Sequence, residues 1–461
     1  MTRYHARWIL PVSAPPIRDG TVVEQGGRIT YVGPRASAPS DADDVDLGDA
    51  LLLPGLVNAH CHLELTAMRG FLDGLGFREW ILRLTAARRA VLSPESLLDS
   101  SRLGVAEGVR AGITTFADTG DSGTGFDAML ERGVRGICYR EVFGPDPVQC
   151  DGAVAELRAR VVEMRTRETP LVRVGVSPHA PYTVSDALFR ATAALAREFA
   201  APMAIHIAES ALESELVVHA AGLFADGLRT RGIGVSARAR SPIALLESLG
   251  VLELAPLLIH CVRVDAADVR AIAGHDCGVA HCPASNAKLA HGIAPLIELL
   301  DAGARVGLGS DSVASNDRMD LLDEARLALL LQSARTGRAN ALSASNALEL
   351  ATLGGARALG IAHDVGSLEV GKAADLAAFP LGAGGRAPTH DPAAAAVLTL
   401  AGTPASFVAV AGRPLVRNSE LIDADAGVHA RVQSAAERLR AWADSDEGTR
   451  AIVTPTPTPG R

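Results

Sequence analysis

Gly55-Leu-Val-Asn-Ala-His60-Cys61-His62 is the stretch that indicates the fold. It begins as a short apolar run, the pattern of a strand buried on both faces of a parallel sheet. It ends in two histidines separated by a single residue. Residues two apart on a strand project from the same face, so both imidazoles can reach one metal ion. The stretch therefore predicts a buried strand whose carboxyl end carries two metal ligands.

The same pattern returns along the central part of the chain. Short apolar runs that end in polar residues alternate with segments of helical period, which is typical of βα units and a parallel sheet. Eight such runs occur, at residues 55–60, 112–118, 136–141, 172–177, 203–206, 257–260, 278–281 and 306–311. Eight units over roughly 300 residues fit a (β/α)8 TIM barrel. The alternative, a doubly wound open sheet, lacks its usual G-x-G-x-x-G after the first strand.

The two ends of the chain show a different pattern. Short β-rich runs separated by glycine and aspartate occupy residues 8–12, 21–24 and 28–32, and similar runs return at 366–370, 375–379 and 407–416. Neither end is large enough to hold a core alone, so we expect both to pair into one small β-sandwich domain. The predicted fold class is α/β, with residues 1–54 and 364–425 in the β-sandwich domain and 55–363 in the barrel. Residues 426–461 are predicted to form a helix, Val428 to Trp442, and a disordered Thr-Pro tail.

The net charge, the hydropathy pattern and the spacing of the cysteines exclude several classes of protein. The net charge of −9 disfavours nucleic acid and anionic membrane surfaces as partners. No stretch approaches the ~20 apolar residues of a membrane span, and residues 1–10 lack the apolar run of a signal peptide. Six cysteines without a C-x-x-C pair predict neither a zinc ribbon nor a disulfide framework. We expect a cytoplasmic enzyme that acts on a small-molecule substrate. The sequence leaves the oligomeric state open, and a homo-oligomer is one of the alternatives.

Histidines and carboxylates collect at the ends of the predicted strands. A TIM barrel places all of these ends at the one mouth where its active site lies. Imidazole with carboxylate suits zinc or iron, whereas calcium requires mainly oxygen ligands. A lone histidine at a strand end is more often a satisfied polar residue, but six of the eight ends carry a histidine or an acid in register. The residues concerned are His60, His62, His179, His206 with Glu209, His260, His281 and Asp311.

Several motifs occur in the order found in the amidohydrolase superfamily. They are Pro54-Gly-Leu-Val-Asn-Ala-His-Cys-His62, Ser177-Pro-His-Ala-Pro-Tyr-Thr183, His206-Ile-Ala-Glu209, His281-Cys-Pro-Ala-Ser-Asn-Ala-Lys-Leu289, Gly309-Ser-Asp-Ser-Val-Ala-Ser-Asn-Asp317 and Gly366-Ser-Leu-Glu-Val-Gly-Lys-Ala-Ala-Asp375. The chain resembles that superfamily from its N-terminal strands to about residue 420. Within it, the chain is similar to the mononuclear aminohydrolase branch, which contains adenosine, S-adenosylhomocysteine, guanine and aminodeoxyfutalosine deaminases and the triazine hydrolases.

The resemblance implies a role for each residue of the site. Metal ligation is implied for four residues, namely His60, His62, His206 and Asp311. Glu209 would be the proton shuttle, His260 would lie beside the reacting water, and His179 would contact the substrate. Glu64 is a candidate polar contact to the substrate, or alternatively a buried structural acid.

The expected cofactor is one divalent metal ion, with zinc favoured and iron as the alternative. Binuclear members of the superfamily bridge their metals with a carboxylated lysine or a glutamate on the barrel. The only lysines of this chain are Lys288, after the seventh strand, and Lys372, outside the barrel. A lysine bridge at the fourth strand is therefore excluded, and the sequence favours one metal.

The implied reaction is hydrolytic deamination of an amino-substituted heteroaromatic ring. A metal held by three His and one Asp lowers the pKa of a bound water toward neutrality. Asp311 would take a proton from that water, and Glu209 would protonate the ring nitrogen and then the leaving amine. The other zinc deaminase design requires a P-C-x-x-C motif, which this sequence lacks.

The motifs favour a purine nucleoside-like substrate such as aminodeoxyfutalosine. His62-Leu-Glu64 and the motifs around His179 and Asp311 look most like the aminodeoxyfutalosine deaminases. S-adenosylhomocysteine deaminases carry an acid for the ribose in the helix after the first strand, and Leu84-Thr-Ala-Ala-Arg-Arg89 has none. The alternatives are a triazine-type chloro- or aminohydrolase, a guanine or S-adenosylhomocysteine deaminase, and, from another class, a metal-binding scaffold without turnover.

Overall fold

Eight parallel strands carry the central part of the chain, in a computed structural model that describes residues 1–461 apart from 42, 383–387, 447 and 449–461. Neighbouring strands pair in parallel within two four-stranded sheets. Each strand overlaps a run predicted from the sequence, so the prediction of these elements is confirmed. One sheet contains β6 (Leu56–Cys61), β7 (Ile113–Gly120), β8 (Arg135–Val142) and β9 (Val172–Pro178), and the other contains β10 (Ala204–Ile207), β11 (Leu257–His260), β12 (Gly278–His281) and β13 (Arg305–Leu308).

The two parallel sheets meet at both of their edges. At one seam Val176 of β9 pairs with Met203, just ahead of β10, and at the other Cys61 of β6 pairs with Asp311, just beyond β13. The backbone N–H of Asp311 donates to the carbonyl of His60 at 3.0 Å. The carboxyl ends of the first and last strands are therefore adjacent, although they are separated by about half of the chain.

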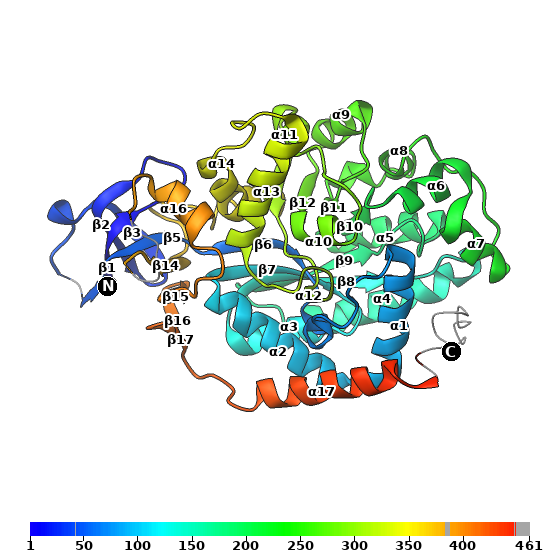
Figure 1. Cartoon of the computed structure of the whole chain (residues 1–461), viewed down its shortest axis with the longest axis horizontal. Coiled ribbons are helices and arrows are strands. Elements are labelled where there is room, and N and C mark those ends of the chain that lie inside the picture. Colours follow the sequence, from blue (N-terminus) through cyan, green and yellow to red (C-terminus); the bar gives the residue numbers. More distant parts are fainter. Residues whose placement is uncertain (42, 383–387, 447, 449–461) are drawn as a thin grey trace.

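Helices follow the strands along the chain and lie outside them (Figure 1). Serine side chains begin several of them: Ser93 accepts the N–H of Ser96, and Ser185 accepts that of Leu188. Pro94 follows Ser93 at the first helical position, as the sequence predicts. The helices around the strands are α2 (Pro94–Arg110), α3 (Thr124–Arg132), α4 (Cys150–Arg165), α5 (Asp186–Phe199), α6 (Ala211–His219), α8 (Pro242–Ser248), α9 (Ala266–Gly274), α10 (Pro283–Lys288), α11 (Leu296–Asp301), α12 (Val313–Asn316), α13 (Leu321–Thr336), α14 (Ala344–Glu349) and α15 (Gly355–Ala358). Two more, α1 (Phe77–Val91) and α7 (Gly222–Thr230), contribute side chains to the cavity described below.

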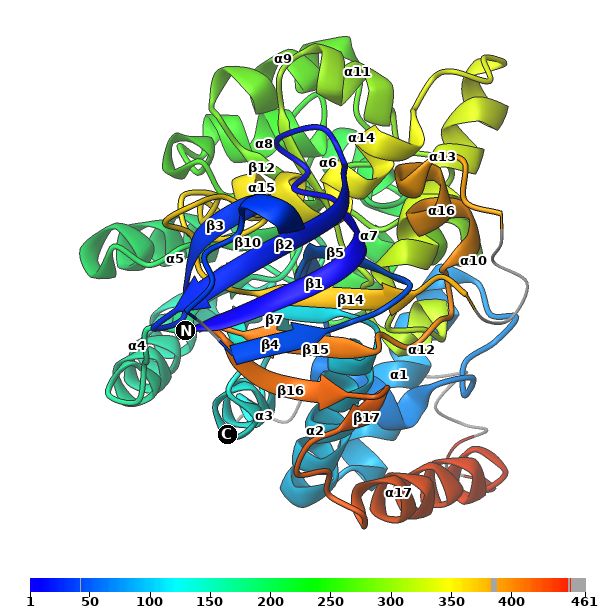
Figure 2. The ribbon, with the colours of Figure 1, turned by 90° about the vertical axis from the view of Figure 1, so that its left-hand side faces the viewer.

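Strands from both ends of the chain form one mixed sheet beside the barrel region (Figure 2). The predicted association of the two ends is observed, and the two-layer sandwich stays a prediction. Hydrogen bonds join the nine described strands into a single sheet. The reason is β5, which pairs with β1 along one edge and with β14 along the other. The strands are β1 (Thr2–Ile9), β2 (Ile17–Gln25), β3 (Arg28–Pro34), β4 (Asp43–Asp46), β5 (Ala50–Pro54), β14 (Leu376–Pro380), β15 (Phe407–Val410), β16 (Arg413–Arg417) and β17 (Glu420–Leu421).

The mixed sheet is buried on both faces where it meets the barrel region. Along β5, Leu52 packs into the core of the sheet itself, whereas Leu51 and Leu53 pack into the main core. The guanidinium of Arg135 on β8 also pairs with Asp375, with 2.9 Å between Nε and Oδ2. Residues 366–370, expected to be a β-rich run, form no strand, and Leu368 instead donates its N–H to the carbonyl of Pro11.

The helix predicted near the C-terminus is confirmed as α17 (Val428–Ala443). It runs along the outside of α1 and α2, at the lower edge of the view in Figure 1. Its buried side chains join a second apolar cluster with Phe77 and Trp80 of α1. The Thr-Pro tail that the sequence predicts to be disordered lies outside the described residues.

Leu439→Ala tests how firmly α17 is attached. Leu439 is fully buried in this second cluster, so removing its side chain is expected to lower stability by about 2–5 kcal/mol. Arg440→Ala is the matched control, because that neighbouring side chain is 77% exposed and its loss should change stability by less than about 0.5 kcal/mol. Urea unfolding followed by tryptophan fluorescence measures both, since Trp80 and Trp442 lie in the same cluster. An equal midpoint for the two variants would show that α17 is not packed as described.

All six cysteines are free and buried, in agreement with the predicted lack of a disulfide framework. Among the described residues, no helix combines the length and apolarity needed to cross a bilayer.

Candidate active site

Three imidazoles and one carboxylate converge where β6, β10 and β13 end. The Nε2 atoms of His62 and His206 lie 3.3 Å apart. The Oδ1 atom of Asp311 lies 3.3 Å from Nε2 of His60 and 3.5 Å from Nε2 of His62. These are the four residues for which the sequence implied metal ligation, and the structure brings them together.

These separations match those between ligands of one tetrahedral ion. Zinc binds imidazole nitrogen and carboxylate oxygen at about 2.0–2.2 Å, so two of its tetrahedral ligands lie about 3.4 Å apart. The three distances of the cluster, 3.3, 3.3 and 3.5 Å, are of this size. In addition, Nε2 of His60 is buried without a hydrogen-bond partner among the described residues. The cluster therefore fits a single divalent ion.

The protonation states of the cluster also suit a metal. Burial lowers the pKa of His60 to about 4, and burial with the neighbouring histidines lowers that of His206 well below its usual value. Burial alone would raise the pKa of Asp311, but His60, His260 and His62 together bring it well below its usual value. Neutral imidazoles and an ionised carboxylate are the forms that coordinate metal ions.

Neighbouring side chains hold the donors in position. The hydroxyl of Thr119 lies 3.2 Å from Nδ1 of His62. The second oxygen of Asp311, Oδ2, accepts hydrogen bonds from the hydroxyls of Ser285 and Ser315. Asp311 also has a φ of 55°, in the left-handed region that a non-glycine residue rarely adopts. Such strained conformations persist at sites where the surrounding structure fixes a functional side chain.

His260 lies beside the cluster, and one of its ring nitrogens makes a hydrogen bond within the protein. Its Nδ1 is 3.0 Å from Oδ1 of Asn286, and because an amide oxygen can only accept, Nδ1 must donate. Its Nε2 has no hydrogen-bond partner among the described residues, lies within 4.8 Å of donor atoms of His60 and Asp311, and is 3.5 Å from Oε1 of Glu209. Nε2 of His260 thus faces the same space as the cluster.

Glu209 is the only carboxylate held between two histidines and a tyrosine in this part of the described structure. Its Oε1 lies 3.2 Å from Nε2 of His291, in addition to the contact with His260, and its Oε2 accepts the hydroxyl of Tyr182 at 3.5 Å. Burial would raise the pKa of Glu209, but His260 and His291 outweigh it and lower the pKa. A buried glutamate held ionised beside a metal cluster is suited to accept and deliver a proton.

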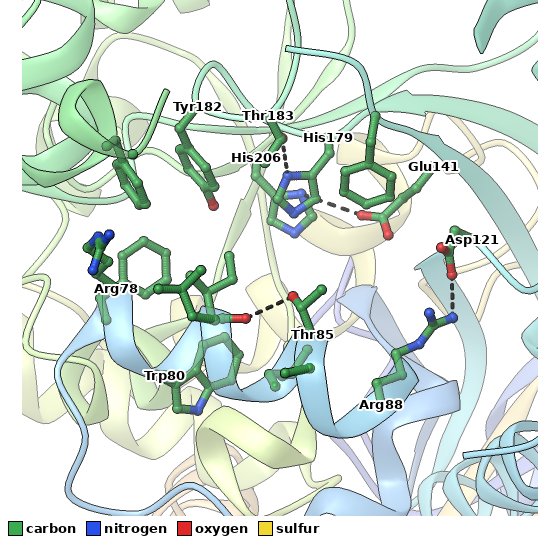
Figure 3. Close-up of a pocket in the computed structure, with 18 of the residues that line it drawn as sticks. Arg78, Trp80, Thr85, Arg88, Asp121, Glu141, His179, Tyr182, Thr183 and His206 are labelled. Carbon is green, nitrogen blue, oxygen red and sulfur yellow. Dashed lines mark hydrogen bonds and ion pairs between the residues drawn. The ribbon is translucent and has the colours of Figure 1, made fainter. Parts of the chain in front are cut away.

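A deep cavity of about 1170 Å³ opens from this cluster (Figure 3). Figure 3 shows α1 along one side of it, with Arg78, Trp80, Thr85 and Arg88, and the strand ends on the other, with Glu141, His179 and His206. The volume exceeds the ~300–1,000 Å³ usual for small-molecule sites. The site can therefore take a substrate larger than the ring at which the chemistry occurs.

The amidohydrolase family matches residues 51–414 of this chain. The protein belongs to the amidohydrolase family. Among similar proteins, the 5-methylthioadenosine/S-adenosylhomocysteine deaminase of Moorella thermoacetica is 34% identical over 427 residues, covering 91% of this chain and 94% of its own. A zinc-bound adenosine deaminase from Xanthomonas campestris is 31% identical with a TM-score of 0.85, covering 95% of this chain and 98% of that one. Atrazine chlorohydrolase from Arthrobacter aurescens, solved with zinc, is 27% identical with a TM-score of 0.82, covering 95% and 100%.

Neither lysine of this amidohydrolase lies in the cluster. Lys288 at the end of α10 pairs with Asp317 and lies 3.5 Å from Asp73, and Lys372 contacts Ser367 and Glu369 beside the mixed sheet. The fourth strand of the barrel region, β9, contains no lysine at all. The structure thus offers no lysine to bridge a second ion.

The two ends of the amidohydrolase's cavity differ in chemistry. One end is mainly aromatic, where Tyr182 and Phe224 stack with 4.3 Å between ring centroids and Phe77 packs edge-on against His291 at 4.5 Å; Arg78 lies at the same end (Figure 3). The other end is polar, where Arg88 lies between Glu64 and Asp121. A molecule that spans the cavity therefore meets rings at one end and charged groups at the other.

The predicted substrate contacts, His179 and Glu64, both line the cavity. His179 stacks at an angle on His206, with 4.8 Å between ring centroids, and its Nδ1 lies 2.7 Å from the hydroxyl of Thr183. The carboxylate of Glu64 is already bound by Arg88 at 2.6 Å and by the backbone N–H of Ser122 at 3.2 Å. Its hydrogen-bonding capacity is largely used within the protein.

Three residues of the site were not singled out by the sequence interpretation, namely Tyr182, His291 and Glu141. Tyr182 lies inside the quoted motif around His179, and His291 lies two residues after the motif that runs from His281 to Leu289. Glu141 ends the third predicted strand, so its position at a strand end was a usable signal. His281, also at a strand end, is buried with both ring nitrogens unpartnered among the described residues and is not part of the donor cluster.

Proposed function

We propose that the protein is a mononuclear zinc-dependent aminohydrolase that deaminates a purine nucleoside-like compound. The observation that carries the proposal is the donor cluster of His60, His62, His206 and Asp311 with ionised Glu209 beside it at the head of the cavity. We also propose that the two parallel sheets, bridged at both seams, constitute one closed (β/α)8 barrel whose mouth holds this cluster.

A zinc ion held by these four residues would polarise an attacking water and lower its pKa toward neutrality. Asp311, held ionised, accepts a proton from the water. Nε2 of His260 faces the same space and hydrogen-bonds to the water, which orients it toward the ring carbon. The new bond joins the oxygen of the water to the ring carbon that bears the amino group.

Glu209 completes the proton transfers. Ionised Glu209 accepts one proton of the attacking water and passes it to the ring nitrogen next to the attacked carbon, while its contacts with His291 and Tyr182 hold the carboxylate in place. The carbon–nitrogen bond to the amino group then breaks, and the amine takes the other proton of the water from Asp311 and leaves as ammonia. The ring keeps the oxygen of the water as its carbonyl oxygen.

The aromatic end of the cavity supports a nucleoside with an apolar substituent on its sugar. Phe77, Tyr182 and Phe224 pack against one another there, and the hydroxyl of Tyr182 reaches Glu209. The relative from Moorella thermoacetica carries 5-methylthioadenosine and S-adenosylhomocysteine in its name, and the methylthio group of the first is such a substituent. Aminodeoxyfutalosine, favoured by the sequence motifs, is retained as a specific candidate of this class.

Ammonia release by the zinc-loaded protein tests the proposal. The panel contains adenosine, 5-methylthioadenosine, S-adenosylhomocysteine, aminodeoxyfutalosine, guanine and the triazine atrazine. We expect ammonia from the adenine nucleosides and none from guanine. Release of chloride from atrazine without ammonia from any nucleoside would instead support the second candidate, a triazine hydrolase, which the likeness to atrazine chlorohydrolase favours. If the protein binds zinc but turns over none of these compounds, the result would support a metal-binding scaffold without turnover.

A further inference from the structure

His206 differs from the other three residues of the cluster in what lies behind it. The hydroxyl of Thr119 is 3.5 Å from Nδ1 of His60 and 3.2 Å from Nδ1 of His62. Two serine hydroxyls donate to the outer oxygen of Asp311. Nδ1 of His206, by contrast, is buried and makes no hydrogen bond with the described residues. The ring of His206 therefore needs a partner that the hydrogen bonds of the structure do not yet supply.

Metal binding fixes which nitrogen of His206 carries the proton. Its Nε2 lies 3.3 Å from Nε2 of His62, inside the cluster, so this nitrogen has to present a lone pair to the ion. A neutral imidazole has a single N–H, which in His206 is then on Nδ1. Leaving that buried N–H unpaired would cost free energy, so an acceptor is expected opposite Nδ1.

The carboxyl group of Glu141 lies opposite this nitrogen. Glu141 is near the end of β8, its side chain is 7% exposed, and its Oε1 is 4.0 Å from Nδ1 of His206 (Figure 3). Oε1 is also buried without a hydrogen-bond partner among the described residues. A shift of about 1 Å brings the two atoms to hydrogen-bond distance, and a glutamate offers an acceptor oxygen whether or not it is ionised. His179 packs against the ring of His206 but makes no hydrogen bond with its Nδ1.

We infer that Glu141 is a positioning residue of the zinc site: it accepts the Nδ1–H of His206 and thereby keeps that imidazole directed at the ion. The inference rests on the zinc site of the proposed function and does not depend on which substrate is used. Partners of this kind fix the tautomer and the ring orientation of a metal-binding histidine, and their loss lowers metal affinity by about 10–100-fold.

Zinc affinity, measured without substrate by competition with a chromogenic chelator, tests the inference. Glu141→Met, which has a similar length but no strong acceptor, should bind zinc about 10–100-fold more weakly than wild type. Glu141→Gln should stay within about threefold of wild type, because its amide oxygen can accept the same hydrogen bond. Asp121→Asn is the matched control and should keep the affinity of wild type, since it alters a carboxylate that lines the same cavity but pairs with Arg88.

Cobalt(II) in place of zinc gives a second readout, because its visible absorption bands report the arrangement of ligands around the ion. The bands should change in Glu141→Met and be kept in Glu141→Gln and Asp121→Asn. Glu141→Leu replaces the Met variant if circular dichroism shows that the Met variant is unfolded.

Two results would overturn the inference. One is a Glu141→Met variant with the zinc affinity and cobalt bands of wild type. The other is an equal loss of affinity in Glu141→Met and Glu141→Gln, which would assign the effect to charge or packing. Wild type that binds no zinc would refute the metal site of the proposed function and the inference with it. Wild type that binds zinc but deaminates none of the compounds would refute the proposed function alone.

Discussion

Glu209→Gln is expected to reduce kcat/KM for ammonia release by about 10²–10⁴-fold, the usual contribution of a positioned acid–base group. The amide keeps the shape of the side chain but can no longer carry a proton between the water and the ring. Glu209 is not one of the four donors of the cluster, so the zinc content of the variant should equal that of wild type. Steady-state kinetics with the best substrate of the panel and elemental analysis of the same preparation measure the two effects.

The controls for Glu209→Gln distinguish a loss of proton transfer from a general loss of activity caused by the substitution. Glu247→Gln is the matched surface variant, because Glu247 is half exposed and contacts only His275 among the charged groups described; it should retain full activity. If Glu209→Gln kept activity within threefold of wild type, the assigned proton shuttle would be wrong. If it lost zinc together with activity, the carboxylate would belong to the metal site instead.

Asp311→Asn is expected to lower activity by at least about 10⁴-fold, because one substitution removes both a metal ligand and the acceptor for the proton of the water. Asp311 is the only anionic member of the cluster. An amide is a weaker ligand, so zinc should be lost on dialysis against a chelator at a concentration that leaves wild type loaded. Adding zinc in excess should restore little activity, since the proton acceptor is still missing.

Asp301→Asn is the control for Asp311→Asn. It makes the same chemical change at an exposed position at the end of α11, outside the donor cluster and the cavity lining, and should change neither zinc retention nor turnover. Retention of zinc by Asp311→Asn at the chelator concentration that spares wild type would remove Asp311 from the ligand set. Far-ultraviolet circular dichroism of both variants checks that the fold is kept.

The sequence was most informative where function depends on the ends of regular strands. His60 and His62 lie on or next to β6, and His206 lies within β10, so their positions follow from strand period and strand order. Asp311 lies three residues beyond the end of β13, and its placement depends on a pairing with Cys61 across the seam. The motif in the sequence predicted that position, although the strand itself is shorter than expected.

Long-range packing explains what the sequence did not predict. The partner of Glu209, His291, comes from a loop about 80 residues away, and no local period marks it. The single sheet at the chain ends depends on β5 pairing with β1 and β14, and β14 is more than 300 residues away along the chain. The pairing of Arg88 with both Glu64 and Asp121 likewise depends on side-chain geometry that no sequence pattern marks.

A zinc titration of the metal-free protein tests the central claim most directly. Protein stripped with a chelator and dialysed should release no ammonia from an adenine nucleoside that the native protein deaminates. Activity should return linearly with added zinc and reach its plateau at one equivalent per chain, because the cluster offers four donors for one ion and no bridging lysine. Full activity without metal, or a plateau only at two equivalents, would contradict the account.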